Sequence, residues 1–114
     1  MPFISFNTTK KLTADQKDQV ASMFGKNISL LSGKTESKLM VDISDNHTMY
    51  FAGEKRESLV FIDVRLYLMI NLFDKKAFTE EIFKGIEKIC EIKENEIFLN
   101  FIELETWGSM GSLK

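Results

Sequence analysis

The hydrophobic pattern of this chain runs through the same order twice, and that repetition constrains the fold more than any other feature. Residues 3–7 alternate with period two, and strand-like segments return at 39–43, 58–68 and 96–104. Between the first two segments, and again between the last two, apolar residues recur at helical spacing. A helix between two strands is the crossover that parallel pairing requires. The pattern predicts an α/β fold: two βαβ repeats forming a four-stranded mixed sheet with two helices on one face.

Capping residues indicate where the two helices begin and end. Thr13 followed by Gln16 is a capping box, and Gly33 stands where the C-cap of the first helix is expected. Asp74 is predicted to cap the second helix. The apolar stripe of the first helix comprises Val20, Met23, Phe24, Ile28 and Leu31. The stripe of the second comprises Phe78, Ile82, Ile86 and Ile89.

The chain length and the last strand together predict one domain in an oligomer. A chain of 114 residues has room for a single domain, 1–114. The last strand carries Phe98 and Ile102 on one face and apolar residues on the other face as well. A sheet that is apolar on both faces should be buried on both. Because no chain is left to cover the second face, we expect a closed oligomer.

Composition excludes several classes of function. The net charge is −2 with acids and bases mixed, so no nucleic-acid partner is expected. The longest apolar run, 66–70, is too short for a membrane span. Cys90 and His47 are the only residues of their types, which excludes most zinc sites and an internal disulfide. Cys90 is interpreted as a core residue and His47 as a solvated loop residue. The first residues lack the pattern of a signal peptide, so a cytoplasmic protein is expected.

Pro2 has the most distinctive chemistry in the chain. Removal of Met1 leaves its secondary amine as the N-terminus. An ordinary α-amino group titrates at about 7.7–8.0, and burial or a nearby cation lowers that value. A neutral amine can take a proton as a general base. The structural alternative is a proline that begins an edge strand.

Short segments spread along the chain carry a family resemblance. They are MPFISFNT at 1–8, SGK at 32–34 with SKLMV at 37–41, MYFAG at 49–53, EIFLNF at 96–101 and WGSMGS at 107–112. In this order and spacing they resemble the macrophage migration inhibitory factor (MIF) family of the tautomerase superfamily. The resemblance implies a homotrimer of βαβ-repeat subunits with sites at subunit boundaries. It also implies cofactor-independent keto–enol tautomerase activity, an isomerase reaction, on small 2-keto acids such as phenylpyruvate.

The same resemblance implies roles for particular residues. Pro2 would take the proton beside the ketone, and Lys34 would bind the substrate carboxylate and keep Pro2 neutral. Leu66 matches an apolar pocket residue whose backbone contacts substrate, and Asn100 matches a pocket residue from the neighbouring subunit. Phe98 stands where the family usually has tyrosine, which keeps the apolar wall and loses the hydroxyl. The alternatives are a solvated lysine, a core leucine and an asparagine that bonds for structural reasons.

Departures from the family pattern change the expected pocket. Lys38 replaces an aromatic residue, Ser109 stands where an aromatic wall can occur, and Lys114 ends the chain in place of phenylalanine. The pocket is therefore expected to be richer in positive charge, with a weaker preference for aromatic substrates. Arg65 is either a second carboxylate ligand or the partner of Asp63 or of a neighbouring subunit.

Two other functions stay open at this point. One is a MIF-like cytokine that binds a cell-surface receptor, is secreted without a signal peptide, and has incidental catalysis. The other is a different reaction of the superfamily, dehalogenation or decarboxylation, for which Arg65 is the only hint.

Overall fold

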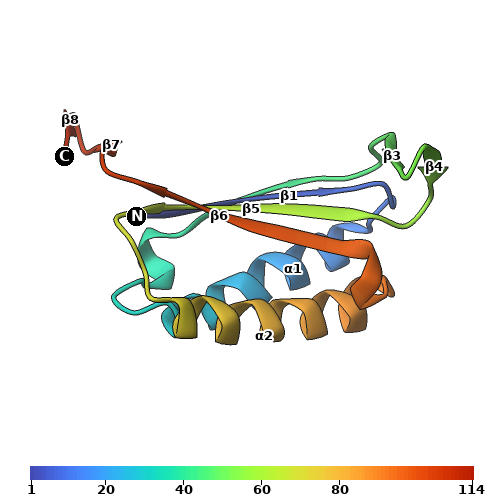
Figure 1. Ribbon diagram of the computed structural model, residues 1–114, viewed down its shortest axis with the longest axis horizontal. Helices are drawn as coiled ribbons and strands as arrows, with labels where there is room; N and C mark the ends of the chain where they lie inside the picture. Colours follow the sequence, from blue (N-terminus) through green and yellow to red (C-terminus); the bar gives the residue numbers. More distant parts are fainter.

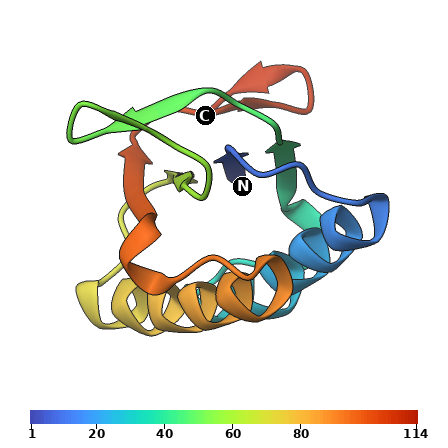
Figure 2. The ribbon, with the colours of Figure 1, turned by 90° about the vertical axis from the view of Figure 1, so that its right-hand side faces the viewer.

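A four-stranded mixed sheet with two helices on one face forms the body of the molecule. The computed structural model describes all residues, 1–114. The sheet strands are β1 (Pro2–Thr8), β2 (Met40–Ser44), β5 (Val60–Tyr67) and β6 (Ile97–Leu104), in the order β2-β1-β5-β6. The pairs β1–β2 and β5–β6 are parallel, whereas β1–β5 is antiparallel. Helices α1 (Ala14–Asn27) and α2 (Leu72–Cys90) lie side by side on one side of the sheet (Figures 1 and 2). The predicted fold class is confirmed.

The core lies between the sheet and the helices, as the alternating pattern predicts. In β1, Ile4 and Phe6 are fully buried while their neighbours are half-buried, and β5 buries every second residue from Val60 to Leu66. The helices contribute Val20, Phe24, Phe78, Ile82 and Ile86. The opposite face of the sheet, called the open face below, carries the other residues of each strand. It includes Phe61, which is 40% exposed, and Met40, which is 65% exposed.

The first helix ends earlier than predicted. α1 stops at Asn27, and Ile28–Leu30 continue as a 3₁₀ turn (η1), so the buried residues Ile28 and Leu31 follow the α-helix rather than belong to it. Gly33 has a φ of 80°, but it lies in a later turn where the Lys34 amide donates to the Leu31 carbonyl. The prediction that Gly33 is the helix C-cap is therefore wrong, although its left-handed conformation suits glycine.

The second helix has a different cap from the one predicted. Its N-cap is Asn71, whose side chain accepts from the Asp74 amide at 2.8 Å. The carboxylate of Asp74 accepts from both the hydroxyl and the amide of Ser32, and the hydroxyl bond is the main cause that lowers the Asp74 pKa. Asp74 thus ties the first turn of α2 to the loop before β2. Cys90 is buried as predicted, and burial raises its pKa to about 11.

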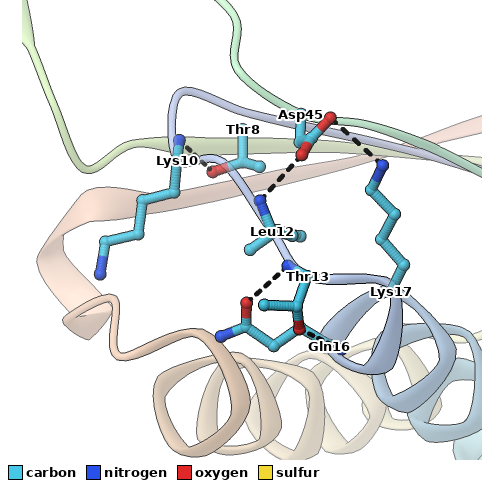
Figure 3. Close-up of polar contacts among 7 residues, drawn as sticks. All are labelled: Thr8, Lys10, Leu12, Thr13, Gln16, Lys17 and Asp45. Carbon is cyan, nitrogen blue, oxygen red and sulfur yellow. Dashed lines mark hydrogen bonds and ion pairs between the residues drawn. The ribbon is translucent and has the colours of Figure 1, made fainter.

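The loop between β1 and α1 is fixed by polar contacts to the end of β2 (Figure 3). The capping box of Thr13 and Gln16 is present in both directions, with bonds of 2.9 and 3.0 Å. Asp45, just beyond β2, accepts from the Leu12 amide at 2.8 Å and forms an ion pair with Lys17 at 3.4 Å. These contacts fix the positions of β1, β2 and α1 relative to one another.

Two short hairpins extend the ends of the sheet. One joins β3 (Met49–Phe51) to β4 (Glu54–Arg56), and the other joins β7 (Gly108–Ser109) to β8 (Ser112–Leu113). They lie at opposite ends of the molecule (Figure 1). The β7–β8 hairpin lies at the end where the chain begins. Neither helix is long and apolar enough to cross a lipid bilayer.

The capping box generates a stability prediction. Thr13→Ala removes the acceptor for the Gln16 amide, so we expect the free energy of unfolding to fall by roughly 0.5–2 kcal/mol in urea denaturation. Thr35→Ala is the matched control, because Thr35 precedes a short 3₁₀ turn and makes no capping bond. Equal losses in the two variants would contradict the assignment.

Candidate active site

Pro2 begins β1 at the end of the sheet where four segments meet. It pairs with Leu66 near the end of β5, and the next residue, Phe3, lies between Met40 of β2 and Arg65 of β5. Because β2 runs parallel to β1, the segment that leads into β2 reaches this end as well. The exits of β5 and β6 lie here too, because both strands run opposite to β1. Topology alone therefore gathers residues from distant parts of the sequence around the N-terminus.

A cavity of about 460 Å³ opens at this end of the molecule. Its wall combines apolar and cationic side chains from β1, β2, β5 and the segment after β6. The lining residues are Met1, Pro2, Phe3, Lys38, Met40, Arg65, Leu104, Thr106, Trp107, Gly108 and Ser109. Such a mixture of an apolar wall and a few charged groups is typical of sites for small organic ligands.

The electrostatics of this end favour a neutral amine. The structure includes Met1, and the pKa of its amino group is lowered first by burial and then by the charges of Lys34, Lys38 and Lys114, in that order. Both causes act against the protonated form. Pro2 is buried one residue further in. Its nitrogen, freed by removal of Met1, would stand close to the same cations.

Lys34 lies beside this site but does not line the cavity. Its ammonium group donates a hydrogen bond to the Tyr67 carbonyl at 2.9 Å. Tyr67 directly follows Leu66, the residue of β5 that pairs with Pro2. Burial lowers its pKa from the usual 10.5. Among the neighbouring charges, Lys34 has the largest effect on the terminal amine. The predicted role in keeping the base neutral fits this position, and two of its three donors remain for a ligand.

The side chain of Leu66 is fully buried in the core. It points to the helix side with Val64 and Ile62, so it does not form a wall of the cavity. Any contact between this position and a substrate would involve its backbone. The carbonyl that Lys34 contacts belongs instead to the next residue, Tyr67, which the sequence analysis did not single out.

Phe98 and Asn100 lie away from Pro2 within the same chain. Both are on the open face of β6. Phe98 pairs with Phe61 of β5, which in turn pairs with Asn7 of β1. In the same way Asn100 pairs with Asp63, which pairs with Ser5. Asn7 is five positions from Pro2 and Ser5 is three, which corresponds to about 16 Å and about 10 Å along a strand. Phe98 packs against Phe51 of β3, with ring centroids 5.2 Å apart. One protomer thus does not bring these two residues into the cavity.

The structure brings two cations into the cavity: Lys38, expected there from the resemblance, and Arg65, whose partner was left open. Arg65 does not pair with Asp63, and its guanidinium lies 5.5 Å from the centre of the Phe3 ring. Lys38, in a 3₁₀ turn (η2, Glu36–Lys38) before β2, lines the same space. Trp107, which the sequence analysis used only for the resemblance, forms part of the wall.

No cluster of histidine, cysteine, aspartate or glutamate side chains is arranged to hold a metal ion. His47 is exposed in the loop after β2, as predicted.

Solved structures with the same fold are MIF, MIF-like and tautomerase-superfamily proteins. The crystal structure of Leishmania major MIF2 has a TM-score of 0.89 and 21% sequence identity, over 100% of this chain and 97% of that one. The MIF-like protein of Entamoeba histolytica gives 0.84 and 23%, over 99% and 98%. Pt0534, inactivated by 2-oxo-3-pentynoate, gives 0.86 and 15%, over 96% and 93%. No protein-family model and no curated protein matches the chain. The chain has the fold of these proteins over its whole length.

The cation cluster generates a prediction for the N-terminal pKa. Lys34→Met removes a positive charge that disfavours the protonated amine, so we expect the pKa of the N-terminal nitrogen to rise. Lys38→Met should raise it less. The measurement is the pH dependence of acylation of the N-terminus, with intact mass identifying the first residue.

Lys11→Met is the control, because Lys11 is exposed and is not among the charges that lower this pKa. The assignment is wrong if Lys34→Met and Lys11→Met give the same pKa as the unchanged protein.

Proposed function

We propose that this chain is a MIF-type keto–enol tautomerase that acts on small 2-keto acids with Pro2 as its general base. The observation that carries the proposal is the position of the N-terminus, which lies in a cavity and next to cations that lower its pKa. The fold shared with MIF proteins supports it. So does Pt0534, a protein of this fold that a 2-oxo acid inactivates.

In the proposed reaction Pro2 takes a proton from C3 of the 2-keto acid. The electron pair of that C–H bond becomes the C2–C3 double bond, and the ketone oxygen gains the negative charge and then a proton. Atoms and charge balance, since the product is an isomer of the substrate. Lys34 holds the carboxylate at C1 and disfavours protonation of Pro2. Positive groups near the ketone oxygen stabilise the developing charge.

A closed trimer completes the site in this proposal. Phe98 and Asn100 are too far from Pro2 in their own chain, so they would reach the Pro2 site of a neighbouring subunit. The apolar residues of the open face, among them Phe61 and Ile102, support such an association, because water would otherwise contact them. Phenylpyruvate is the aromatic member of the substrate class, with Phe98 and Trp107 as apolar walls.

Substitution of Pro2 tests the catalytic role. Pro2→Ala replaces the secondary amine with a primary one, and we expect tautomerisation of phenylpyruvate enol to fall by roughly 10²–10⁴-fold, the usual contribution of a general base. The decay of enol absorbance gives the rate, and intact mass establishes that Met1 is absent. Lys11→Met should keep full activity.

Full activity in Pro2→Ala, or in protein that retains Met1, would overturn the proposal. The cytokine-like alternative has the opposite expectation, because binding to a cell-surface receptor would tolerate the loss of the amine.

Co-expression tests whether each site is shared between subunits. Pro2→Ala and Asn100→Ala each damage a different half of the proposed site, so both variants should have low activity alone. In mixed trimers some sites pair an intact Pro2 with an intact Asn100, and we expect activity to return to a substantial fraction of the unchanged value. Mixed oligomers that stay as inactive as the two separate variants would show that each site lies within one chain.

A further inference from the structure

The cavity beside Pro2 carries more positive charge than a substrate with one carboxylate requires. Lys38 and Arg65 line it, and Lys34 lies next to it. The three ion pairs of the chain are Lys17–Asp45, Lys75–Glu103 and Lys84–Glu81, so none of these cations has a carboxylate partner. In a chain with a net charge of −2 such a concentration of unpaired cations is unusual.

Positions on both sides of β1 supply these two cations. Phe3 pairs with Met40 on one side and with Arg65 on the other. Lys38 precedes Met40 by two residues, so the two cations flank Phe3 from neighbouring strands. Two strand spacings amount to about 10 Å between backbones, and the long lysine and arginine side chains can shorten this distance. Both side chains are exposed, so a ligand in the cavity can reach them.

Arg65 is suited to recognise a carboxylate. Its guanidinium lies over the face of Phe3, 5.5 Å from the ring centre. This contact holds the side chain in place through its flat face, while the N–H donors lie in the guanidinium plane. Arginine binds carboxylates through two parallel hydrogen bonds.

The apolar part of the wall contains few aromatic side chains. Phe3 and Trp107 are its only aromatic residues, and its other apolar residues are Met1, Pro2, Met40 and Leu104. The Arg65 guanidinium already lies over one of these two rings, Phe3.

We infer that the preferred substrates are 2-keto dicarboxylates, with Lys38 and Arg65 binding the carboxylate distant from the ketone. This inference rests on the proposed function, since Lys34 and Pro2 keep the roles given above. Lys38 and Arg65 determine specificity, and the second carboxylate also orients C3 toward the nitrogen of Pro2.

Competition between two enols tests the specificity. The unchanged protein should ketonise the enol of oxaloacetate with a higher kcat/KM than that of phenylpyruvate. In Arg65→Met and Lys38→Met, the ratio of the two kcat/KM values should fall by roughly tenfold to hundredfold, the usual effect of a lost charge-assisted hydrogen bond. Lys55→Met, in the distant β3–β4 hairpin, should leave the ratio unchanged. A ratio that favours phenylpyruvate, or that neither cavity variant lowers, overturns the inference.

A binding measurement separates this inference from the catalytic proposal. Trp107 is the only tryptophan and lines the cavity, so its fluorescence reports ligand binding. Glutarate, which has no ketone, should bind at least about tenfold more tightly than butyrate, and Arg65→Met should remove the difference. If glutarate binds in this way but no enol is ketonised, tautomerisation is wrong and dicarboxylate recognition stands. If enols are ketonised but glutarate and butyrate bind alike, dicarboxylate recognition is wrong and the tautomerase stands.

Discussion

The pairing of β1 between β2 and β5 is the constraint on which the rest of this structure depends. β1 is parallel to β2 and antiparallel to β5, so its first residue lies beside the entry to β2 and the exits of β5 and β6. A shift of one residue would turn Ile4 and Phe6 out of the core, and the hydrophobic effect therefore fixes the register. The same packing that stabilises the sheet thus fixes the register of β1, and with it the position of the N-terminal nitrogen.

The elements that the sequence predicted well are those decided by local pattern. Alternation along 60–66 and the Thr13–Gln16 capping box both reappear in the structure. The two hairpins were not predicted, because their turns lack the usual asparagine or aspartate before glycine. Ala52–Gly53 and Met110–Gly111 have positive φ at both residues, as in type I′ turns, although alanine and methionine rarely adopt it. The end of α1 and the cap of α2 depend on tertiary contacts, such as that of Ser32 with Asp74, which no local pattern reveals.

The candidate site divides along the same line. Pro2 was singled out by its secondary amine and supported by the resemblance, whereas Lys34 came from the resemblance alone; the neighbourhood of both follows from topology. The contact that Arg65 makes was not predictable, because the alternating pattern indicates which face of the sheet its side chain is on but not which group it contacts. Asp63 is on the same face two residues away, about 7 Å along the strand, yet Arg65 turns to Phe3 instead. Sequence spacing likewise places Phe98 and Asn100 on the open face without saying which subunit's cavity they approach.

A base that must stay neutral next to an anionic substrate poses an electrostatic problem, and the cation cluster addresses it. An incoming carboxylate favours the protonated amine, and so it would raise the pKa that the protein has lowered. Lys34, Lys38 and Arg65 together carry three positive charges, so a dicarboxylate bound as proposed would leave one in excess at this site. A single lysine would be neutralised by the first carboxylate. In the proposed reaction the surplus of cations would serve both needs, because it would attract the substrate and disfavour protonation of the base after the substrate has bound.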